Sequence, residues 1–188
     1  LNSTDDAIKG LSGIRVKAKL SLYHGTQKVK EETGELLFKD NGISGIVTFN
    51  LSSEIARSKG NGYSVEVDFI PEFSPEEIEK AGAAAFLRRP IFNAVKKQAA
   101  SGKASVSAAA KSFRIIIDGL GDIKNAQVVS GGLNNNEFNP NTLESKLVKN
   151  LYAVGEALDV DGVCGGYNLH WAFSSALACS EAIINKFR

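Results

Sequence analysis

Residues 151–171 read Leu151-Tyr-Ala-Val-Gly-Glu-Ala-Leu-Asp-Val-Asp-Gly-Val-Cys-Gly-Gly-Tyr-Asn-Leu-His-Trp171, and small and apolar residues continue to Phe187. The apolar run at the start predicts a short buried strand at 151–154, and the glycines and aspartates that follow predict a loop. The next residues predict a long helix over 169–187, and its few charges predict burial over most of its surface. A glycine-rich loop before a helix is typical of sites for anionic or electron-rich ligands. This stretch is therefore the first candidate for a functional site.

The composition is that of an ordinary globular protein without a strong charge bias. The 188 residues are 43% hydrophobic and 23% charged, with a formal net charge of +1. Such a small charge gives no reason to expect nucleic acid or an acidic membrane as a partner. No apolar run is long enough to span a bilayer and no signal-peptide pattern opens the chain, so we expect a cytoplasmic protein. We expect Cys164 and Cys179 to be reduced thiols, because two cysteines are too few for a disulfide framework.

The first residue is Leu1, and the sequence contains no methionine. A chain translated from its own start codon begins with methionine. We therefore expect this chain to be a piece of a longer protein, and we expect any site that needs upstream residues to be incomplete in it.

Residues 13–70 have the alternation and the turns of antiparallel β-structure. Apolar and polar residues alternate over 14–23 and again over 63–69, the period of a half-buried strand. Turn signals such as Asn41-Gly42 separate further short segments. The predicted strands are 14–23, 28–32, 34–38, 46–51 and 63–69. Short connections between about five strands predict a small antiparallel barrel or a strongly curled sheet.

The period of the apolar residues changes after Pro71. Ser74-Pro75-Glu76-Glu77 has an N-cap, a proline at the first helical position and acids in the first turn. The predicted helices are 75–87, 90–100 and 105–112. Arg88, Arg89, Lys96 and Lys97 give this region a basic character, which we interpret as a solvated helical face, because no aromatic residues are interleaved as in a nucleic-acid patch.

Three later apolar runs predict further strands. The first, 113–117, ends at Asp118-Gly119, and the second, 126–129, ends at Ser130-Gly131-Gly132. The third is 151–154. The last two are almost continuously apolar, which is typical of strands buried on both faces.

The start of the long helix is the strongest candidate site. Gly165, Gly166, Tyr167 and Asn168 lie where free backbone N–H groups and the positive end of the helix dipole are expected. Asn168 is the expected N-cap. Such a helix end favours a ligand with a carbonyl or a developing negative charge. The same Gly-Gly pattern is equally typical of a purely structural helix start.

Asp159 and Asp161 lie two residues apart in the loop, and three roles are open for them. They can bind a metal, act as acid and base, or cap the backbone of their own loop. A metal site is not favoured, because His24 and His170 lie in different elements and no Cys/His ligand spacing occurs. The sequence has no catalytic-triad motif, Walker motif or complete dinucleotide-binding motif. We therefore assign no catalytic residue and no metal ligand.

An ordered series of segments resembles the C-terminal portion of a bacterial flavoprotein family. The segments are Val128-Val-Ser-Gly-Gly-Leu133, Asn139-Pro-Asn-Thr-Leu-Glu-Ser-Lys-Leu147, 151–162 and Gly165-Gly-Tyr-Asn-Leu169. Gly34-Glu-Leu-Leu-Phe38 and Gly42-Ile-Ser-Gly45 are similar to the insert domain of the same family. It is the family of NAD(P)/FAD-dependent, aminoacetone-oxidase-like oxidoreductases in the two-dinucleotide-binding superfamily.

The resemblance implies an α+β fold in which an insert domain interrupts a split FAD-binding domain. Residues 1–124 would form the insert domain, a small antiparallel β-barrel at about 13–70 and 113–118 with a helical appendage at about 74–112. Residues 125–188 would be the C-terminal strand–loop–helix segment of the FAD-binding domain. The implied partner is the N-terminal Rossmann portion of the same parent protein, which binds the ADP half of FAD.

The resemblance also implies a set of cofactor-binding residues. They are Gly155, Glu156, Gly165, Gly166, Tyr167, Asn168 and Leu169. The first two match a glycine–acid pair near the ribityl-phosphate region, and residues 166–169 place the helix start at the pyrimidine end of the isoalloxazine ring. The helix dipole would stabilise negative charge on the N1–C2=O edge of the reduced flavin. Asp159 and Asp161 would shape the loop, and NAD(P)H would be the reductant.

We therefore expect a piece of an FAD-dependent oxidoreductase that acts on a small-molecule substrate. It would complete the isoalloxazine site of its parent, bind FAD weakly or not at all by itself, and be inactive alone. The alternative is a non-catalytic β-barrel module that binds a partner or serves as a substrate lid. A third, weaker option is a hydrolase that uses Asp159 and Asp161. A G-x-G-x-x-G strand–turn–helix upstream of Leu1 would distinguish the first hypothesis from the others.

Overall fold

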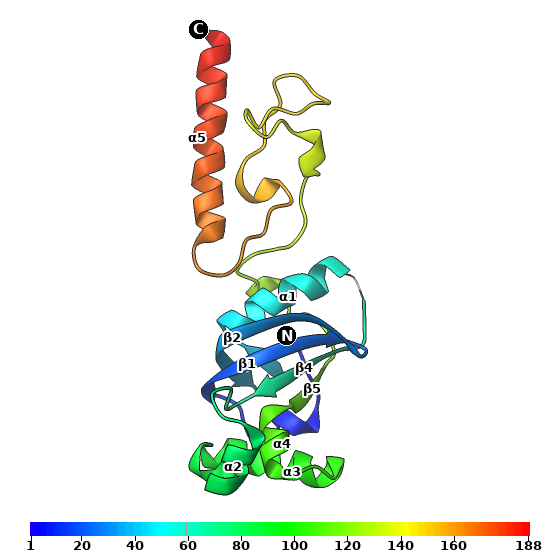
Figure 1. The fold of residues 1–188 in the computed structure, drawn as a ribbon. Coiled ribbons are helices and arrows are strands. Elements are labelled where there is room, and N and C mark those ends of the chain that lie inside the picture. The colour runs from blue at the N-terminus through cyan, green and yellow to red at the C-terminus, as the bar shows by residue number, and fades with distance from the viewer. Residues whose placement is uncertain (59) are drawn as a thin grey trace. The chain divides into compact units, whose positions relative to one another are not determined.

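The computed structural model describes residues 1–58 and 60–188. The chain divides into two compact units, Leu1–Gly121 (unit 1) and Asp122–Arg188 (unit 2), which are treated separately below (Figure 1). No helix in these described ranges is both long and apolar enough to cross a membrane.

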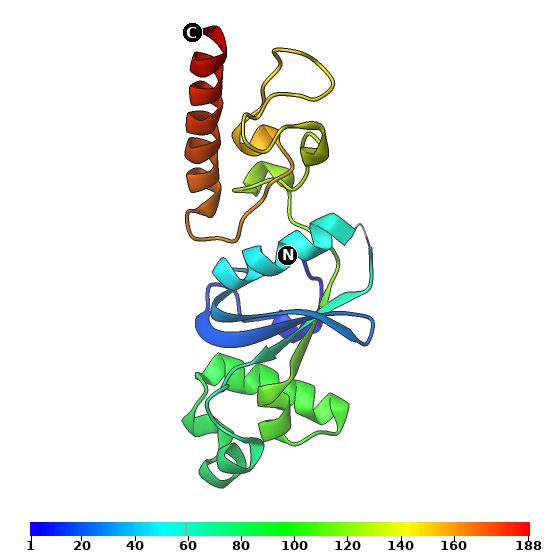
Figure 2. The same ribbon diagram turned by 45° about the horizontal axis from the view of Figure 1, so that its top comes forward.

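Unit 1 is built on an antiparallel five-stranded sheet in the order β3-β2-β1-β4-β5. The strands are β1 (Arg15–His24), β2 (Gln27–Lys39), β3 (Gly42–Ser44), β4 (Tyr63–Asp68) and β5 (Phe113–Ile117). The central strand β1 pairs along its whole length with β2, from Arg15 opposite Leu37 to His24 opposite Gln27. The sheet curls into a half-barrel (Figure 2). The prediction of helices combined with a curled antiparallel sheet is therefore confirmed.

The first residues of the chain link the two edges of this half-barrel. Asn2 forms single β-bridges with Gly42, at the start of β3, and with Gly119, just beyond β5. The Asn2 N–H donates to the Gly119 carbonyl at 2.9 Å, and the Ile43 N–H donates to the Leu1 carbonyl at 2.9 Å. A Cβ atom at Gly42 would lie 2.1 Å from the Leu1 oxygen, so only glycine permits this approach.

Two of the predicted strands form one continuous strand in the structure, and a third predicted strand is part of a helix. Segments 28–32 and 34–38 both belong to β2, because Gly34 continues the ladder opposite Ala18. The prediction of a strand at 46–51 is wrong, since these residues begin helix α1 (Ile46–Ser58). Its buried residues include Val47, Leu51 and Ile55, which recur every four positions and therefore share one helical face, packed on β2. Residues 46–51 are rich in residue types that favour strands, and the run is too short to show a helical period in the sequence.

Helices α2 (Pro75–Ala81), α3 (Arg89–Gly102) and α4 (Val106–Lys111) gather on the opposite side of the sheet from α1 (Figures 1 and 2). The predicted start of α2 is confirmed as a capping box. The Glu77 N–H donates to Ser74 Oγ at 3.3 Å, and the Ser74 N–H donates to the Glu77 carboxylate at 2.8 Å. This helix ends at Ala81 rather than Leu87, because Gly82 adopts φ +81°.

Unit 1 has one continuous apolar core with a polar clamp at its boundary. Leu20, Val65 and Phe113 are fully buried in it. The Lys111 ammonium lies 2.8 Å from the Asp68 carboxylate and donates to the Ile70 carbonyl at 2.9 Å. The other Asp68 oxygen accepts from the Ile70 N–H at 2.9 Å. This network fixes α4 to the end of β4.

Unit 2 is largely irregular chain packed on one long helix, α5 (Tyr167–Phe187). The strands predicted at 126–129 and 151–154 are not formed. The first has no regular structure, and in the second only Tyr152 is bridged, to Glu144. An extended segment becomes a strand only where a neighbour pairs with its N–H and C=O groups. Among the described residues, unit 2 offers only isolated bridges.

Helix α5 is not buried over most of its surface, contrary to the prediction. Ser175 and Cys179 are buried, and Trp171 and Ile183 pack beside them against the small core of unit 2. The opposite face carries large apolar side chains that are at least half exposed. They are Leu169, Phe173, Leu177, Ile184 and Phe187, called here the α5 stripe. A helix that is apolar on both sides is typical of one buried in a larger structure.

Candidate functional site

The turn Gly155–Ala157 is clamped to α5 by two hydrogen bonds. The Gly155 N–H donates to Ser175 Oγ at 2.9 Å, and Trp171 Nε1–H donates to the Gly155 carbonyl at 3.0 Å. Gly155 is buried and has φ +60°, a conformation that side chains disfavour. Glu156 is exposed. The clamp therefore holds Glu156 at the surface, next to a fixed backbone turn.

Two exposed glycines, Gly165 and Gly166, precede helix α5. Gly166 is the residue before the helix and has φ +94°, and as a glycine it supplies no capping side chain. The His170 N–H makes the first bond of the helical ladder, to the Gly166 carbonyl at 2.9 Å. The N–H groups of residues 167–169 therefore lie ahead of that ladder. Together with the positive end of the dipole, they suit an anionic or electron-rich group.

Asn168 is not the N-cap that the sequence predicts. Its side chain accepts from the Gly162 N–H at 2.7 Å and donates to the Gly162 carbonyl at 3.1 Å. This pair of bonds closes the loop before the helix on itself. A Cβ atom at Gly162 would lie 3.0 Å from the Cβ of Tyr167, so a glycine is favoured there. The loop is thus fixed by its own atoms, and the Asn168 side chain does not cap the helix.

A second pairing holds the aspartate-containing part of the loop. Leu133 and Leu158 form a parallel bridge, in which the Asp159 N–H donates to the Leu133 carbonyl at 3.0 Å. Asn135 Nδ2–H donates to the Asp159 carbonyl at 2.7 Å. A Cβ atom at Gly132 would lie 2.7 Å from the Leu158 carbonyl carbon. The part of the chain that the structure describes contains no group of three or more residues that could hold a metal ion.

Both sets of predicted cofactor-binding residues lie at α5: residues 165–169 are at its start, and Gly155 and Glu156 are in a turn that is hydrogen-bonded to it. Trp171, which holds the Gly155 turn, lies four residues and hence about 6 Å along the axis from Tyr167. Sequence reasoning missed the two clamp residues, Trp171 and Ser175. Trp171 is the only tryptophan of the chain, and it lies in a helix with many small residues, which was the available signal.

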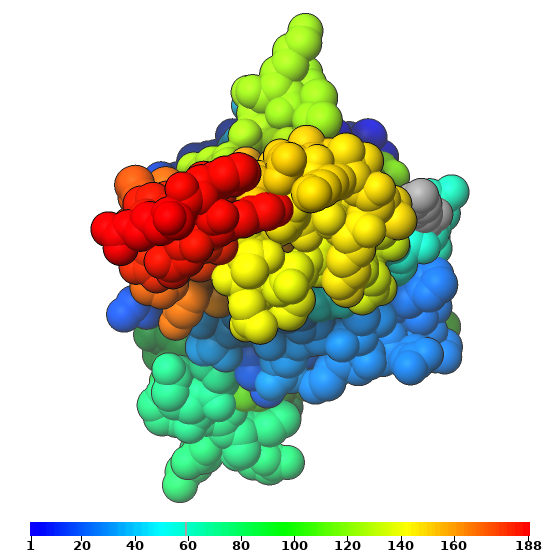
Figure 3. Space-filling model, turned by 90° about the horizontal axis from the view of Figure 1, so that it is seen from above, coloured from blue at the N-terminus to red at the C-terminus, as the bar shows by residue number. Residues whose placement is uncertain are grey.

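The far end of α5 is held by a polar cluster that lies away from the helix start. Lys186 Nζ lies 2.6 Å from a Glu144 oxygen and 3.4 Å from the Tyr152 hydroxyl. The hydrogen bond with Lys186 lowers the pKa of Glu144, and the same bond raises the pKa of Lys186. Figure 3 shows this red end of α5 beside the yellow loop that contains Glu144. The cluster anchors the helix to its own unit.

Comparison with known proteins identifies relatives for most of the chain. The sequence profile of the HI0933-like protein Rossmann domain family matches residues 15–182. The 3-dehydro-bile acid delta(4,6)-reductase of Clostridium scindens is 33% identical over 201 residues, which span 91% of this chain and 49% of that protein. The ribosomal RNA dihydrouridine synthase of Haemophilus influenzae is 28% identical, over 96% of this chain and 49% of that protein. The Escherichia coli protein of the same name is 42% identical over 72 residues, 38% of this chain and 18% of that protein.

The chain thus spans about half the length of the first two relatives. The profile match includes residues of both units. It agrees with the flavoprotein resemblance that the ordered sequence segments indicate. The chain belongs to the HI0933-like protein Rossmann domain family, an FAD-type oxidoreductase family.

Proposed function

We propose that this chain is the insert domain and the C-terminal flavin-facing segment of an FAD-dependent reductase. The observation that carries the proposal is the glycine-led start of α5, where the N–H groups of residues 167–169 precede the helical ladder. Residues 165–169 would hold the pyrimidine end of the isoalloxazine ring. Gly155 and Glu156 would contact the ribityl-phosphate region from the clamped turn.

The residues at the helix start fit an electron-rich planar ring. Gly165 and Gly166 are exposed and carry no Cβ, so a flat group can approach their backbone closely. Backbone N–H groups and the helix dipole stabilise negative charge at the edge of a reduced flavin. The bonds between Asn168 and Gly162 keep these donors in place before a ligand arrives. Such preorganised donors lose little free energy in reorganisation.

The other half of the site is the N-terminal Rossmann portion of the same parent protein. The α5 stripe supports this assignment, because contiguous exposed apolar surface marks an interface. About half of the length of the first two relatives lies outside the match to this chain, which is enough for such a portion. In the assembled protein the stripe is buried, as the sequence of α5 predicts.

The reaction is the addition of two hydrogens across a carbon–carbon double bond next to a carbonyl group in the substrate. One relative is named a reductase, and another is named for making dihydrouridine, which is uridine with two added hydrogens. When bound, the reduced flavin would supply the hydride, water would supply the proton, and NAD(P)H would be the reductant of the flavin. The helix start of this chain would orient the ring, and the stripe would close the interface with the Rossmann portion.

To test the proposal, this chain is joined to the Rossmann portion, and the bound flavin is measured by visible absorbance. Phe173→Glu with Leu177→Glu should weaken flavin retention by more than about tenfold, because burying unpaired charges costs several kcal/mol. Both side chains are exposed in this chain, so the same changes should leave the stability of the chain alone unaltered. Asn185→Glu, at an exposed position outside the stripe, is the matched control. Full flavin retention by the stripe variant would refute the proposed interface.

A further inference from the structure

The Ser175 hydroxyl joins the Gly155 turn to the backbone of α5. Ser175 is only 2% exposed, and its Oγ accepts from the Gly155 N–H at 2.9 Å. The same hydroxyl donates to the Ala172 carbonyl at 3.1 Å, one turn earlier in the helix. Because Ser175 is buried, water does not readily replace either bond.

Two further contacts hold the same turn against the helix. Trp171 Nε1–H donates to the Gly155 carbonyl at 3.0 Å, so both backbone polar groups of Gly155 bond to side chains of α5. A Cβ atom at Gly155 would lie 3.5 Å from the Cβ of Ala172, so the turn packs directly on the helix. The turn therefore cannot slide along α5 without breaking a hydrogen bond of the buried Gly155.

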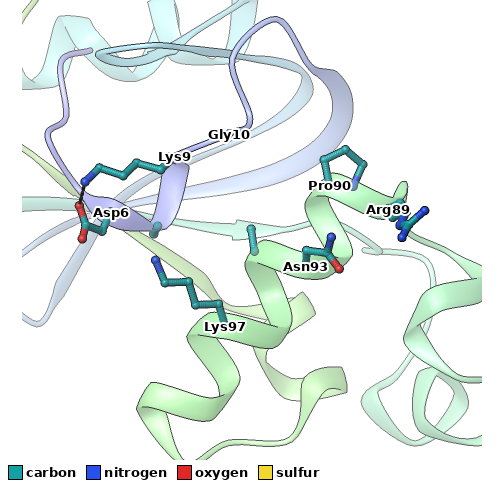
Figure 4. A pocket seen from close by; sticks show the side chains of 9 residues that line it. Asp6, Lys9, Gly10, Arg89, Pro90, Asn93 and Lys97 are labelled. Atoms are coloured by element: carbon teal, nitrogen blue, oxygen red, sulfur yellow. Dashed lines mark ion pairs between the residues drawn. The ribbon is translucent and has the colours of Figure 1, made fainter.

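The charged hollow of unit 1 in Figure 4 differs from this clamp. Its ion pair, between Lys9 and Asp6 at 2.6 Å, joins side chains that are 72% and 68% exposed. Arg89 extends away from Lys97, so these two cations do not converge on one point. Exposed charges of this kind are screened by water. The buried contacts of the Gly155 turn, in contrast, fix one geometry.

The clamp also fixes a spacing between two parts of the candidate site. Ala172, on which the turn packs, lies five residues after Tyr167 in the continuous helix α5, about 7.5 Å along its axis. The turn and the N–H groups of residues 167–169 are therefore held at one separation. A ligand that contacts both must have two parts at that separation.

We propose that Ser175 and Trp171 are positioning residues, which set the turn for the ribityl-phosphate part of the flavin. These roles rest on the proposed function and extend it to two side chains that act through Gly155 and Glu156. A turn that is already ordered loses little conformational freedom when a ligand binds, so its contacts strengthen binding. The isoalloxazine ring lies at the helix start in the proposed function, and its surroundings do not depend on the clamp.

A purely structural role for the clamp gives a different result. If Ser175 served only to keep unit 2 folded, its loss would disturb the helix start and the turn together. The surroundings of the ring and of the phosphate would then change in parallel. A positioning role changes the surroundings of the phosphate alone, and this difference decides between the two roles.

The test uses the chain joined to the Rossmann portion and loaded with FAD. Ser175→Ala, which removes the acceptor of the Gly155 N–H, should raise the dissociation constant of FAD by about tenfold. In phosphorus NMR, the resonance of the phosphate on the ribityl side should move toward its position in free FAD. The visible absorption maximum and the reduction potential of the bound flavin, which report on the ring, should stay as in the unaltered protein.

Two further variants accompany this change. Trp171→Phe removes the second bond to the turn but keeps an aromatic ring, and it should produce the same pattern to a smaller extent. Ser180→Ala is the matched control, because Ser180 makes the same kind of bond, to the Leu177 carbonyl at 2.8 Å, at an exposed position. It should change neither the phosphate resonance nor the dissociation constant.

Failure of the proposed function and failure of the positioning role are distinguishable. An unaltered joined protein that retains no FAD would overturn the proposed function, and the positioning role with it. Retention of FAD by that protein, with the same phosphate resonance in Ser175→Ala and Trp171→Phe, would overturn only the positioning role. A parallel change of the ring and phosphate signals would also overturn it. Circular dichroism checks that each variant is folded.

Discussion

The two units of this chain use their apolar residues differently. In unit 1, the apolar side chains of the sheet lie in one continuous core, and residues such as Leu20 and Phe113 are fully buried. In unit 2, the small core covers only one side of α5, and the α5 stripe is left at the surface. Large apolar side chains thus fill a core in unit 1, whereas several of them remain exposed in unit 2.

This difference bears on the position of the candidate flavin site. Unit 1 buries its apolar residues in one continuous core of its own. A unit with an unfinished core gains its full structure when a partner covers it. The candidate flavin site lies at the start of the helix that carries the unfinished face.

The largest effect is expected from a matched pair of phenylalanine truncations. Phe113 is fully buried, with its ring 5.4 Å from that of Phe69, whereas Phe173 is 69% exposed. Phe113→Ala should lower the free energy of unfolding of unit 1 by about 3–5 kcal/mol, and Phe173→Ala should change that of unit 2 by less than about 0.5 kcal/mol. Urea unfolding followed by circular dichroism measures the first and fluorescence of Trp171 the second. Equal losses would remove the distinction between the units.

The next effect concerns the clamp between β4 and α4. Asp68→Ala removes the acceptor of the Ile70 N–H and the ion-pair partner of Lys111, which keeps only the Ile70 carbonyl, and this should cost about 2–4 kcal/mol of unfolding free energy. Glu35→Ala removes an exposed ion pair with Arg15 and should cost less than about 1 kcal/mol. Urea midpoints of the two variants test the difference, and an Asp68→Ala protein as stable as Glu35→Ala would contradict it.

A smaller effect is expected within unit 2. Ser175→Ala removes the buried acceptor of the Gly155 N–H and should cost about 1–2 kcal/mol. Trp171 donates to the same turn, so its fluorescence should report the loosening, and exchange of the Gly155 amide hydrogen should accelerate. Ser180→Ala, at an exposed position of α5, is the control. Unchanged exchange at Gly155 would show that the clamp does not hold the turn.

The smallest effect is a dependence of the end of α5 on pH. The hydrogen bond with Lys186 holds the pKa of Glu144 below its ordinary value of 4.5. A carboxyl group whose pKa is lowered by folding contributes stability above its unfolded pKa, and this contribution is lost as the pH falls through the folded value. Amide exchange near Ile184 should therefore accelerate below about pH 4.5. In Lys186→Gln this acceleration should be absent, and its persistence would assign the effect to another group.

Local patterns predicted much of unit 1 and the existence of α5. The alternation over 14–23 and 63–69 and the cap at Ser74 needed only nearby residues, and the structure confirms them. Helix α1 was missed because it begins with the β-branched residues Ile46 and Val47. Their local preference is for strands, and only contacts with distant residues favour the helix. Burial was harder to predict, because it depends on contacts between distant segments.

The candidate site shows the same limit. The glycines before α5 could be found from the sequence, and their assignment to FAD stays a prediction. The bond pair between Asn168 and Gly162 could not be found, because an asparagine near a helix start usually caps it. The clamp of Trp171 and Ser175 on Gly155 also joins residues that are far apart in the sequence. Such contacts depend on how the loop returns to the helix.

We propose that the start of α5 forms half of a flavin site, with the Rossmann portion as the other half. This proposal is tested most directly by titrating FAD into the purified 188-residue chain, alone and joined to the Rossmann portion, with visible absorbance as the readout. We predict that the chain alone retains little or no FAD and that the joined protein retains it stoichiometrically. Stoichiometric yellow flavin on the 188-residue chain alone would contradict it.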